Sequence, residues 1–176
     1  LERISSNTLS PVCNYVPVKK GDVFFIEAGT LHAIGKGILI AEVQQNSNTT
    51  YRVSDYGRLG ADGKPRELHI KQAVDVTKTE KPTKPYGNVG DVTLYPFGTV
   101  RELSSCEYFT AELINLDGNV GIYDNESFIS LLILEGEVSL SYTGGMMKLK
   151  KGDSLFLPAG LKVRLCGSGE ILYTHM

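Results

Sequence analysis

Two short stretches of the sequence are closely related: VKKGDVFFIEAG at residues 18–29 and LKKGDSLFLPAG at residues 149–160. They align without gaps at a constant offset of 131 residues, and seven of the twelve positions are identical. Each stretch begins with a Lys-Gly-Asp turn signal, continues through a short apolar run typical of a buried strand, and ends at a second glycine. An internal repeat of this kind predicts two copies of one β-structure.

Short β-rich runs separated by glycine and proline dominate the rest of the chain, which is typical of a sandwich or barrel. The periodicity predicts one helix at 66–77, and the Pro- and Gly-containing stretch 78–93 is typical of a linker. The predicted domains are therefore 1–77 with the helix, the linker 78–93, and 94–176. The predicted strands lie at residues 23–26, 38–43, 51–53, 110–116, 128–134, 154–157 and 170–175.

The composition excludes several classes of partner. The 176 residues are 41% hydrophobic and 22% charged, and the formal net charge is −2. Basic residues never occur in blocks longer than two, so we expect no nucleic acid and no anionic membrane as partner. No apolar run is long enough to span a bilayer. The three cysteines are odd in number, far apart and without a CxxC pair, which favours a reducing cytoplasm.

One histidine stands out because the repeat does not reproduce it. His32 aligns with Val163 at the same offset of 131 residues. The scaffold therefore accepts an aliphatic side chain at this place, which favours a chemical role for His32 over a purely structural one. A lone histidine in a β-rich run is otherwise more often a core residue with satisfied nitrogens.

The repeat also predicts how much of the first unit is present. The second unit begins near Leu94, and its equivalent in the first copy falls before residue 1. We therefore expect the first unit to lack roughly its first third. The first residue is Leu, so we also expect the sequence to begin partway into a longer polypeptide.

The spacing of Gly21, Gly29 and His32 resembles the second signature motif of the cupin family, with Glu27 in the usual proline place. More specifically, AGTLHAIGKGILIAEVQQNSNTTYRVSDYGR followed by GKPRELHIKQAVDV resembles type I mannose-6-phosphate isomerase in its short, Firmicutes-like form. The resemblance implies a mainly β fold of two cupin-type jelly-roll barrels in tandem. The first barrel would be incomplete at its N-terminus, a short helix would connect the two, and the second barrel would be metal-free.

What this resemblance implies about function is specific. Such enzymes are cytoplasmic, zinc-dependent isomerases that interconvert mannose 6-phosphate and fructose 6-phosphate, so the expected partner is a phosphorylated hexose. His32 matches the last ligand of a single zinc ion. The family's other ligands come from a Gln-x-His segment and a glutamate upstream, which this chain lacks. The resemblance therefore predicts that the chain is the C-terminal part of the enzyme.

The resemblance also assigns roles around the metal. Arg52 matches the catalytic arginine, and Arg58 matches a position that grips the sugar phosphate. Glu42 and Asn48 match positions where a carboxylate has been proposed as the proton-transfer base, so Glu42 is the only matched carboxylate here.

The residues themselves allow the same chemistry and a plainer alternative. Alternation along 38–45 places Glu42 and Gln44 on one face of a strand. If Arg52 faces the same barrel interior, the three side chains converge where a metal would lie, and a protonated arginine suits a developing enediolate. The alternative is that Arg52 forms an exposed surface ion pair and that Arg58 is merely solvated.

Two other functions compete with the isomerase. The first is a non-catalytic, metal-free cupin module that binds a sugar or a partner chain. The second is an iron-dependent cupin oxygenase. Such an enzyme would need a His-x-His pair on an upstream strand, and the segment QQNSNTTYR is not part of its sequence pattern.

Overall fold

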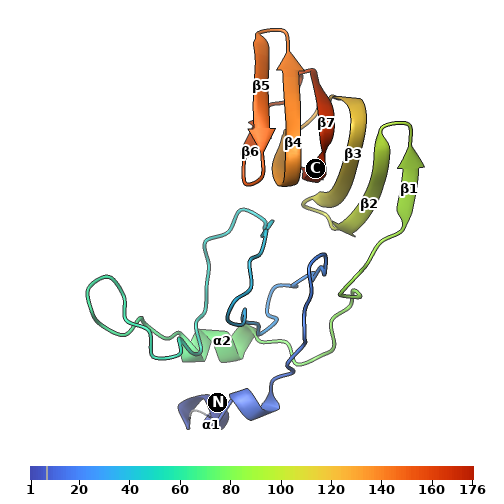
Figure 1. Cartoon of the computed structure of the whole chain (residues 1–176). Coiled ribbons are helices and arrows are strands. Elements are labelled where there is room, and N and C mark those ends of the chain that lie inside the picture. The colour runs from blue at the N-terminus through green and yellow to red at the C-terminus, as the bar shows by residue number, and fades with distance from the viewer. Residues whose placement is uncertain (7) are drawn as a thin grey trace. The chain divides into compact units, whose positions relative to one another are not determined.

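The computed structural model describes residues 1–6 and 8–176, and it consists of two compact units. Unit 1 comprises Leu1–Ala41 and Asn46–Gly87. Unit 2 comprises Glu42–Gln45 and Asn88–Met176. Nearly all of the regular β-structure belongs to unit 2, whereas unit 1 is held together by turns, short helices and isolated bridges (Figure 1).

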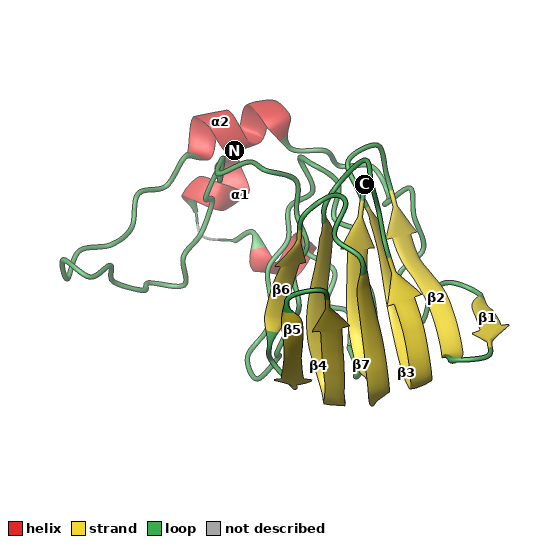
Figure 2. Cartoon of the chain, turned by 90° about the horizontal axis from the view of Figure 1, so that it is seen from above, coloured by secondary structure: helices red, strands yellow, loops and turns green. Residues whose placement is uncertain are grey.

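Unit 2 is an antiparallel β-sheet in the order β1-β2-β3-β7-β4-β5, with β6 paired to the first part of β4 (Figure 2). The long strands β3, β4 and β7 form its centre, and β7 is hydrogen-bonded to β3 on one side and to β4 on the other. The strands are β1 Val92–Tyr95, β2 Gly98–Ser105, β3 Thr110–Ile122, β4 Ile129–Tyr142, β5 Gly145–Lys150, β6 Ser154–Leu157 and β7 Val163–His175.

The core of unit 2 follows from the alternation of apolar residues along these strands. Leu131 and Ile133 of β4 and Leu165 and Ile171 of β7 are fully buried. Since successive side chains of a strand point to opposite faces, residues two apart line the same side of the sheet. The sequence SLLILEGEVSL therefore buries every second residue until the register shifts between Ile133 and Glu135.

A glycine pair allows β4 and β7 to pass closely beside this shift. Gly136 lies opposite Gly169 and has φ +82°. A Cβ atom on Gly136 would lie 2.3 Å from the carbonyl oxygen of Ser168, well inside van der Waals contact. Only glycine combines a positive φ with this close approach of two backbones.

Unit 1 contains three short helical segments and no extended strand among its described residues. They are α1 Glu2–Ser5, the 3-10 helix Ser10–Val12 and α2 Ile70–Val76. The apolar run after the first Lys-Gly-Asp turn is fastened to residues 84–87 instead of to a sheet. Val23 and Gly87 exchange two backbone hydrogen bonds of 2.8 and 2.9 Å, and the ring of Phe24 stacks on that of Tyr86.

The strands predicted at 23–26, 38–43 and 51–53 are wrong as elements of this structure. Apart from the Val23 bridge, these segments are not β-structure. A strand satisfies its backbone groups by pairing with a neighbour, and no β-bridge joins residues 38–43 to any other described segment. The apolar side chains of this segment are exposed, with Ile38 41%, Leu39 92% and Ile40 47% accessible. The jelly roll predicted for residues 1–77 stays a prediction.

The helix predicted at 66–77 is shorter and begins at Ile70. The preceding residues 66–69 are not helical, and they make other contacts. Arg66 binds the carboxylate of Asp55, and the backbone N–H of His69 donates to the carbonyl oxygen of Arg52 at 2.8 Å. Within α2, Ala73 is buried, as the predicted apolar face requires.

In unit 2 the predicted strands at 110–116, 128–134, 154–157 and 170–175 are confirmed, and three of them extend further. The prediction missed β1, β2 and β5. Their sequences VTLY, GTVRELSS and GMMKLK are polar, short or interrupted, and most of their residues are exposed or half-buried. The end of the predicted linker 78–93 forms the start of β1.

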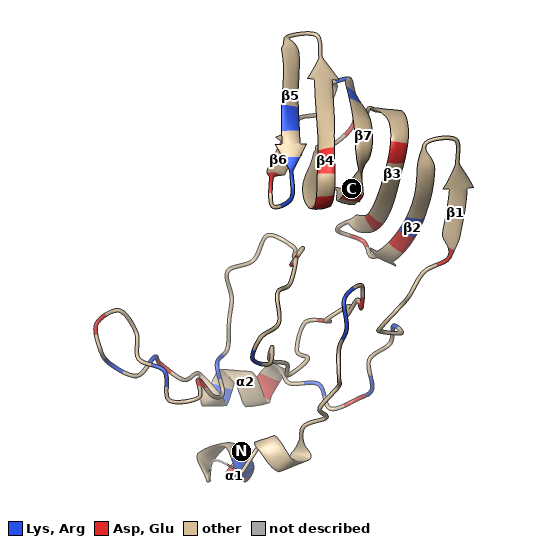
Figure 3. Ribbon diagram, viewed as in Figure 1, with Lys and Arg blue, Asp and Glu red and all other residues tan. Residues whose placement is uncertain are grey.

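Acidic and basic residues are interspersed along the ribbon, in keeping with the net charge of −2 (Figure 3). None of the helices in the described part of the chain is long and apolar enough to cross a bilayer.

Candidate functional site

The two Lys-Gly-Asp turns have the same hydrogen bonds. In the first, the N–H of Lys19 donates to the carboxylate of Asp22 at 3.0 Å, and the N–H of Asp22 donates back to the carbonyl of Lys19 at 3.1 Å. In the second, Lys150 and Asp153 make the same two bonds at 2.8 and 2.9 Å. An Asp side chain that binds a nearby backbone N–H stabilises a turn locally, so the repeated sequence produces the same local structure twice.

The first turn leads to His32 through a segment anchored on α2 and the residues after it. Gly29 has φ +88°, and its carbonyl oxygen accepts a 2.9 Å hydrogen bond from the N–H of Lys78. Glu27, in the place where the motif usually has proline, accepts hydrogen bonds from the backbone and side chain of Thr83. These bonds, together with the nearby Lys78, lower the pKa of Glu27.

His32 is exposed, and within the described residues one of its ring nitrogens is hydrogen-bonded. Nδ1 lies 2.8 Å from the carbonyl oxygen of Thr30. A carbonyl oxygen only accepts hydrogen bonds, so in the neutral ring Nδ1 carries the hydrogen and the lone pair is on Nε2. Histidine ligands of metals are commonly oriented by such a bond. The ring is therefore suited to bind a metal through Nε2.

The described residues do not form a complete zinc site. No group of three or more His, Cys, Asp or Glu side chains among residues 1–6 and 8–176 could hold a metal ion. A catalytic zinc ordinarily takes three protein ligands. His32 can supply one of them, and the described part of the chain does not bring two further ligands of these types to it.

The second candidate centre of unit 1 is an arginine cluster around a buried carboxylate. The side chain of Asp55 is only 6% exposed. Arg66 binds it in a bidentate manner, with Nε 2.6 Å from Oδ2 and Nη2 bonded to Oδ1. Arg58 donates from Nη2 to Oδ1 at 2.8 Å, and Nε of Arg52 lies 3.9 Å from the same oxygen. We call Arg52, Asp55, Arg58 and Arg66 the arginine cluster.

The cluster keeps Asp55 ionised over the whole physiological range. The hydrogen bonds from Arg66, and after them those from Arg58, lower the pKa of Asp55 from the usual 3.8 to about 2, although burial alone would raise it. The same pairing raises the pKa of Arg66. A charge-assisted, bidentate pair of this kind is among the stronger interactions of side chains.

The turn between Asp55 and Arg58 has an uncommon backbone conformation. Tyr56 has φ 52° and is the one residue other than glycine with a positive φ in the described part of the chain. Gly57 follows with φ 71°, and the N–H of Arg58 then donates to the carbonyl oxygen of Asp55 at 2.9 Å. The turn brings the guanidinium of Arg58 back over Asp55 and within 5.9 Å of the Tyr56 ring centroid. A left-handed residue with a large side chain persists only where surrounding contacts enforce it.

Arg52 is fixed by contacts with the segment before α2. Its backbone N–H donates to Nδ1 of His69 at 3.2 Å, and its carbonyl oxygen accepts from the N–H of His69. Its Nη1 donates to the carbonyl oxygen of Glu67 at 3.2 Å. Arg52 does form an ion pair, with Asp55, but its side chain is only 23% exposed, so this pair is not the exposed surface pair of the plainer alternative.

The remaining predicted residues lie outside this cluster. Asn48 is exposed in unit 1, whereas Glu42 and Gln44 are exposed and belong to the short segment that groups with unit 2. The alternating strand on which Glu42 and Gln44 were expected to share a face is not formed. The predicted convergence of these two side chains with Arg52 stays a prediction.

Two members of the cluster, Asp55 and Arg66, were missed by the sequence analysis. A signal was present in the chain, since the stretch RVSDYGR places an acidic residue three positions from each of two arginines. Such spacing is ambiguous without the backbone, and the partner Arg66 is eleven residues from Asp55, at a distance that no local pattern indicates.

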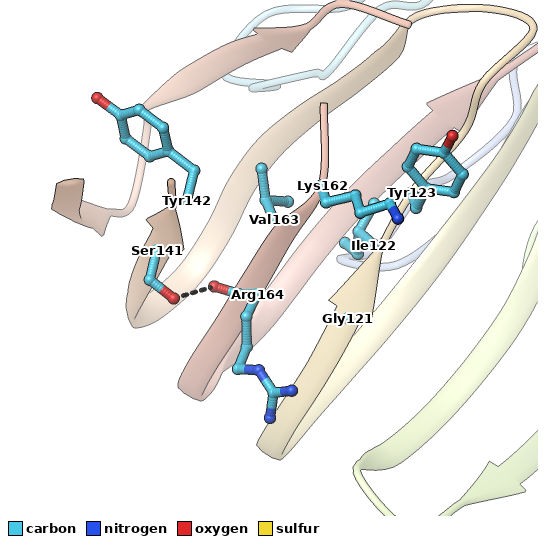
Figure 4. Close-up of a pocket in the computed structure, with 8 residues that line it drawn as sticks. All are labelled: Gly121, Ile122, Tyr123, Ser141, Tyr142, Lys162, Val163 and Arg164. Carbon is cyan, nitrogen blue, oxygen red and sulfur yellow. Dashed lines mark hydrogen bonds between the residues drawn. The ribbon is translucent and has the colours of Figure 1, made fainter. Parts of the chain in front are cut away.

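In unit 2 a shallow pocket of about 530 Å³ lies at one end of β3, β4 and β7 (Figure 4). Val163, the counterpart of His32, is 5% exposed and packs into the core beneath it. The ammonium group of Lys162 lies 5.0 Å from the centroid of the Tyr123 ring. The lining residues are Gly121, Ile122, Tyr123, Ser141, Tyr142, Lys162, Val163 and Arg164.

Comparisons with known proteins find similarity to mannose-6-phosphate isomerases. Residues 99–176 match the family model of the mannose-6-phosphate isomerase cupin domain. The chain is 38% identical over 166 residues to the mannose-6-phosphate isomerase ManA of Bacillus subtilis, covering 92% of this chain and 51% of ManA. It is 37% identical over 161 residues to the mannose-6-phosphate isomerase of Streptococcus mutans, covering 91% of this chain and 50% of that protein.

The fold agrees with these sequence matches. The crystal structure of the mannose 6-phosphate isomerase from Bacillus subtilis is similar with a TM-score of 0.65 at 31% identity, over 75% of this chain and 42% of that one. The resemblance to mannose-6-phosphate isomerases and the mainly β, antiparallel cupin fold are thereby confirmed, and the match extends well beyond the motifs at 18–76. The chain spans about half the length of the curated relatives it matches.

Proposed function

We propose that the protein to which these residues belong is a cytoplasmic, zinc-dependent aldose–ketose isomerase that interconverts mannose 6-phosphate and fructose 6-phosphate. The observation that carries the proposal is the arginine cluster around Asp55, in a chain similar to mannose-6-phosphate isomerases over more than nine tenths of its length. A buried carboxylate that holds several arginines at the surface keeps their guanidinium groups in place, and these groups can then bind an anionic substrate.

In this proposal Arg52 acts at the reacting carbons. Isomerisation removes the proton on C2 of the aldose, returns a proton to C1, and moves a hydroxyl proton from O2 to O1 through an enediol. The intermediate carries negative charge on oxygen, which a permanently protonated and fixed guanidinium stabilises. The three contacts that hold Arg52 to Glu67 and His69 support this role.

The other predicted residues take the remaining roles. Glu42 is proposed as the general base, and Gln44 and Asn48 as hydrogen-bonding partners of the sugar hydroxyls. Arg58, 64% exposed and held at one end by Asp55, is proposed to bind the phosphate. His32 is proposed as one zinc ligand through Nε2, with the other ligands supplied by parts of the protein outside residues 1–176. A bound zinc ion would polarise the substrate's carbonyl oxygen.

The domain assignment follows the same reasoning. We propose that residues 1–77 are the C-terminal part of a first, catalytic cupin, that 78–93 connect, and that 94–176 are a second, metal-free cupin. The matching Lys-Gly-Asp turns of the two units support a tandem repeat. The exposed apolar side chains of residues 24–40 support further strands that would complete the first barrel.

Replacing His32 tests the proposal. In the intact protein, His32→Ala should lose bound zinc and isomerase activity together, measured by elemental analysis and by formation of fructose 6-phosphate. The matched control is Val163→Ala at the equivalent position of the repeat, which should lower only the stability of unit 2. Full zinc occupancy in His32→Ala would remove this residue from the metal site.

A second candidate function concerns unit 2. Its pocket has two exposed tyrosine rings and two cationic side chains, a combination that suits a sugar or an anion, and it favours the alternative of a non-catalytic cupin module. Tyr142→Ala with Lys162→Ala should then abolish binding of mannose 6-phosphate by the chain. Binding that survives this double substitution but is lost in Arg58→Gln would decide for unit 1.

A further inference from the structure

We infer that Arg66 is a phosphate-binding residue. We also infer that Asp55 is a positioning residue, because it holds the guanidinium groups of Arg66 and Arg58 next to each other. The inference rests on the proposed function for the identity of the ligand, a phosphate monoester. It adds two residues to which neither the motifs nor the resemblance assigns a role, and it explains why a carboxylate is buried among arginines.

The charge of the arginine cluster matches this ligand. Three guanidinium groups surround one carboxylate, so two positive charges are left over. Asp55 remains negative because its pKa is lowered to about 2, and the excess therefore stays at two at neutral pH. A phosphate monoester carries about −1.5 to −2 charges at pH 7. A sugar phosphate neutralises the cluster, whereas an uncharged sugar does not.

The exposed fractions show which groups face a ligand. The side chain of Asp55 is 6% exposed, while those of Arg58 and Arg66 are 64% and 40% exposed. The carboxylate therefore lies beneath, and the two guanidinium groups lie between it and solvent. An anion approaching from solvent meets the arginines and not the acid.

The hydrogen bonds leave donors for a ligand. Arg66 uses Nε and Nη2 on Asp55, and Arg58 uses Nη2 on the same carboxylate and Nε on the carbonyl oxygen of Asp55. In each guanidinium Nη1 makes no hydrogen bond to any described residue. A planar guanidinium held along one edge is preorganised, so less side-chain entropy is lost when the other edge binds phosphate oxygens.

The strained turn at Tyr56 supports the same role. A positive φ at a tyrosine is sterically unfavourable, and folding alone gives no reason to retain it. The conformation closes the turn that brings Arg58 back to Asp55. The backbone therefore holds the pair of arginines side by side before any ligand arrives.

The test is the binding of inorganic phosphate to the intact protein by titration calorimetry. Arg66→Gln should raise the dissociation constant about tenfold, in line with the loss of one charge-assisted contact. The matched control is Lys71→Gln, which removes the same charge from an exposed position of α2 and should change binding less than about twofold. Equal effects of the two substitutions would overturn the assignment of Arg66.

A double-substitution cycle separates positioning from general structure. Asp55→Asn should weaken phosphate binding by a similar factor, and adding Arg66→Gln should then have less than about a twofold further effect, because residues that act as a unit are not additive. Full additivity would show that Asp55 does not act through Arg66. If Asp55→Asn does not fold, the comparison of Arg66→Gln with Lys71→Gln still decides.

Failure of this inference is distinguishable from failure of the proposed function. Phosphate binding that follows the expected pattern in a protein without isomerase activity would refute the isomerase and keep the phosphate site. Isomerase activity whose Michaelis constant for mannose 6-phosphate is unchanged in Arg66→Gln would refute the phosphate site and keep the isomerase.

Discussion

The glycine at position 29 offers a sharp test of how the His32 segment is held. Gly29 has φ +88°, and a Cβ atom added to it would lie 2.5 Å from the carbonyl oxygen of Val76 and 3.3 Å from the side chain of Lys78. Gly37, in the same unit, has a similar φ of +79° but no atom within 4 Å of an added Cβ. Alanine at either position meets the same backbone penalty, and only at position 29 does it also collide with the end of α2.

The expected energies follow from these two terms. The left-handed conformation costs an alanine about 1–2 kcal/mol, partly offset by the lower entropy of its unfolded chain, so Gly37→Ala should cost about 1 kcal/mol. At Gly29 the collision adds an overpacking cost of about 1–3 kcal/mol. The backbone shift also strains the hydrogen bond from Lys78, worth about 1 kcal/mol. We therefore expect Gly29→Ala to cost about 2 kcal/mol more than Gly37→Ala.

Amide hydrogen exchange measures this difference locally. The N–H of Lys78 is bonded to the carbonyl oxygen of Gly29, and its exchange reports opening of that contact. A difference of about 2 kcal/mol corresponds to roughly thirtyfold faster exchange in Gly29→Ala than in Gly37→Ala. Equal exchange rates of the Lys78 amide in the two variants would refute the reasoning that Gly29 is selected by its close approach to α2.

Three further outcomes are expected. Leu165→Ala, at a fully buried position of β7, should destabilise unit 2 by about 2–5 kcal/mol in urea unfolding. The control Leu94→Ala, at a position of β1 that is 81% exposed, should change the stability by less than about 0.5 kcal/mol. Similar losses in the two variants would contradict the assigned core. Because the folded-state pKa of Asp55 is depressed, the stability that this carboxylate contributes should be complete above pH 3.8 and be lost as the pH falls through about 2. An NMR titration of the Asp55 carboxyl carbon in the folded protein measures this pKa. A midpoint near 3.8 would disprove the pairing with the arginines. In the intact enzyme, Arg52→Lys should leave zinc bound and reduce turnover by about 10²–10³, and an unchanged rate would remove Arg52 from the mechanism.

Sequence patterns predicted the structure where the deciding contacts are local. The Lys-Gly-Asp turns, the helix around Ala73 and the alternating strands β4 and β7 depend on residues a few positions apart or on an apolar period of two. The strand predictions at 23–26 and 38–43 were wrong for a physical reason. Apolar runs form strands only when a neighbouring strand takes up their backbone hydrogen bonds.

The site was predictable in part for the same reason. His32, Arg52 and Arg58 were predicted from the repeat and the family resemblance, which give positions but not contacts. The pairing of Asp55 with Arg66 and that of Glu27 with Thr83 join residues 11 and 56 positions apart, and no periodicity links them. The tautomer of His32 also depends on a backbone carbonyl that only the folded turn brings near.

The most direct test of the central claim is an isomerase assay on the intact, zinc-loaded protein that contains these residues. Mannose 6-phosphate is supplied, and formation of fructose 6-phosphate is followed in the wild-type protein and in Arg52→Lys. Turnover should be lost on chelation of the metal and strongly reduced in the variant. A fully folded, zinc-loaded wild-type protein that forms no fructose 6-phosphate would contradict it.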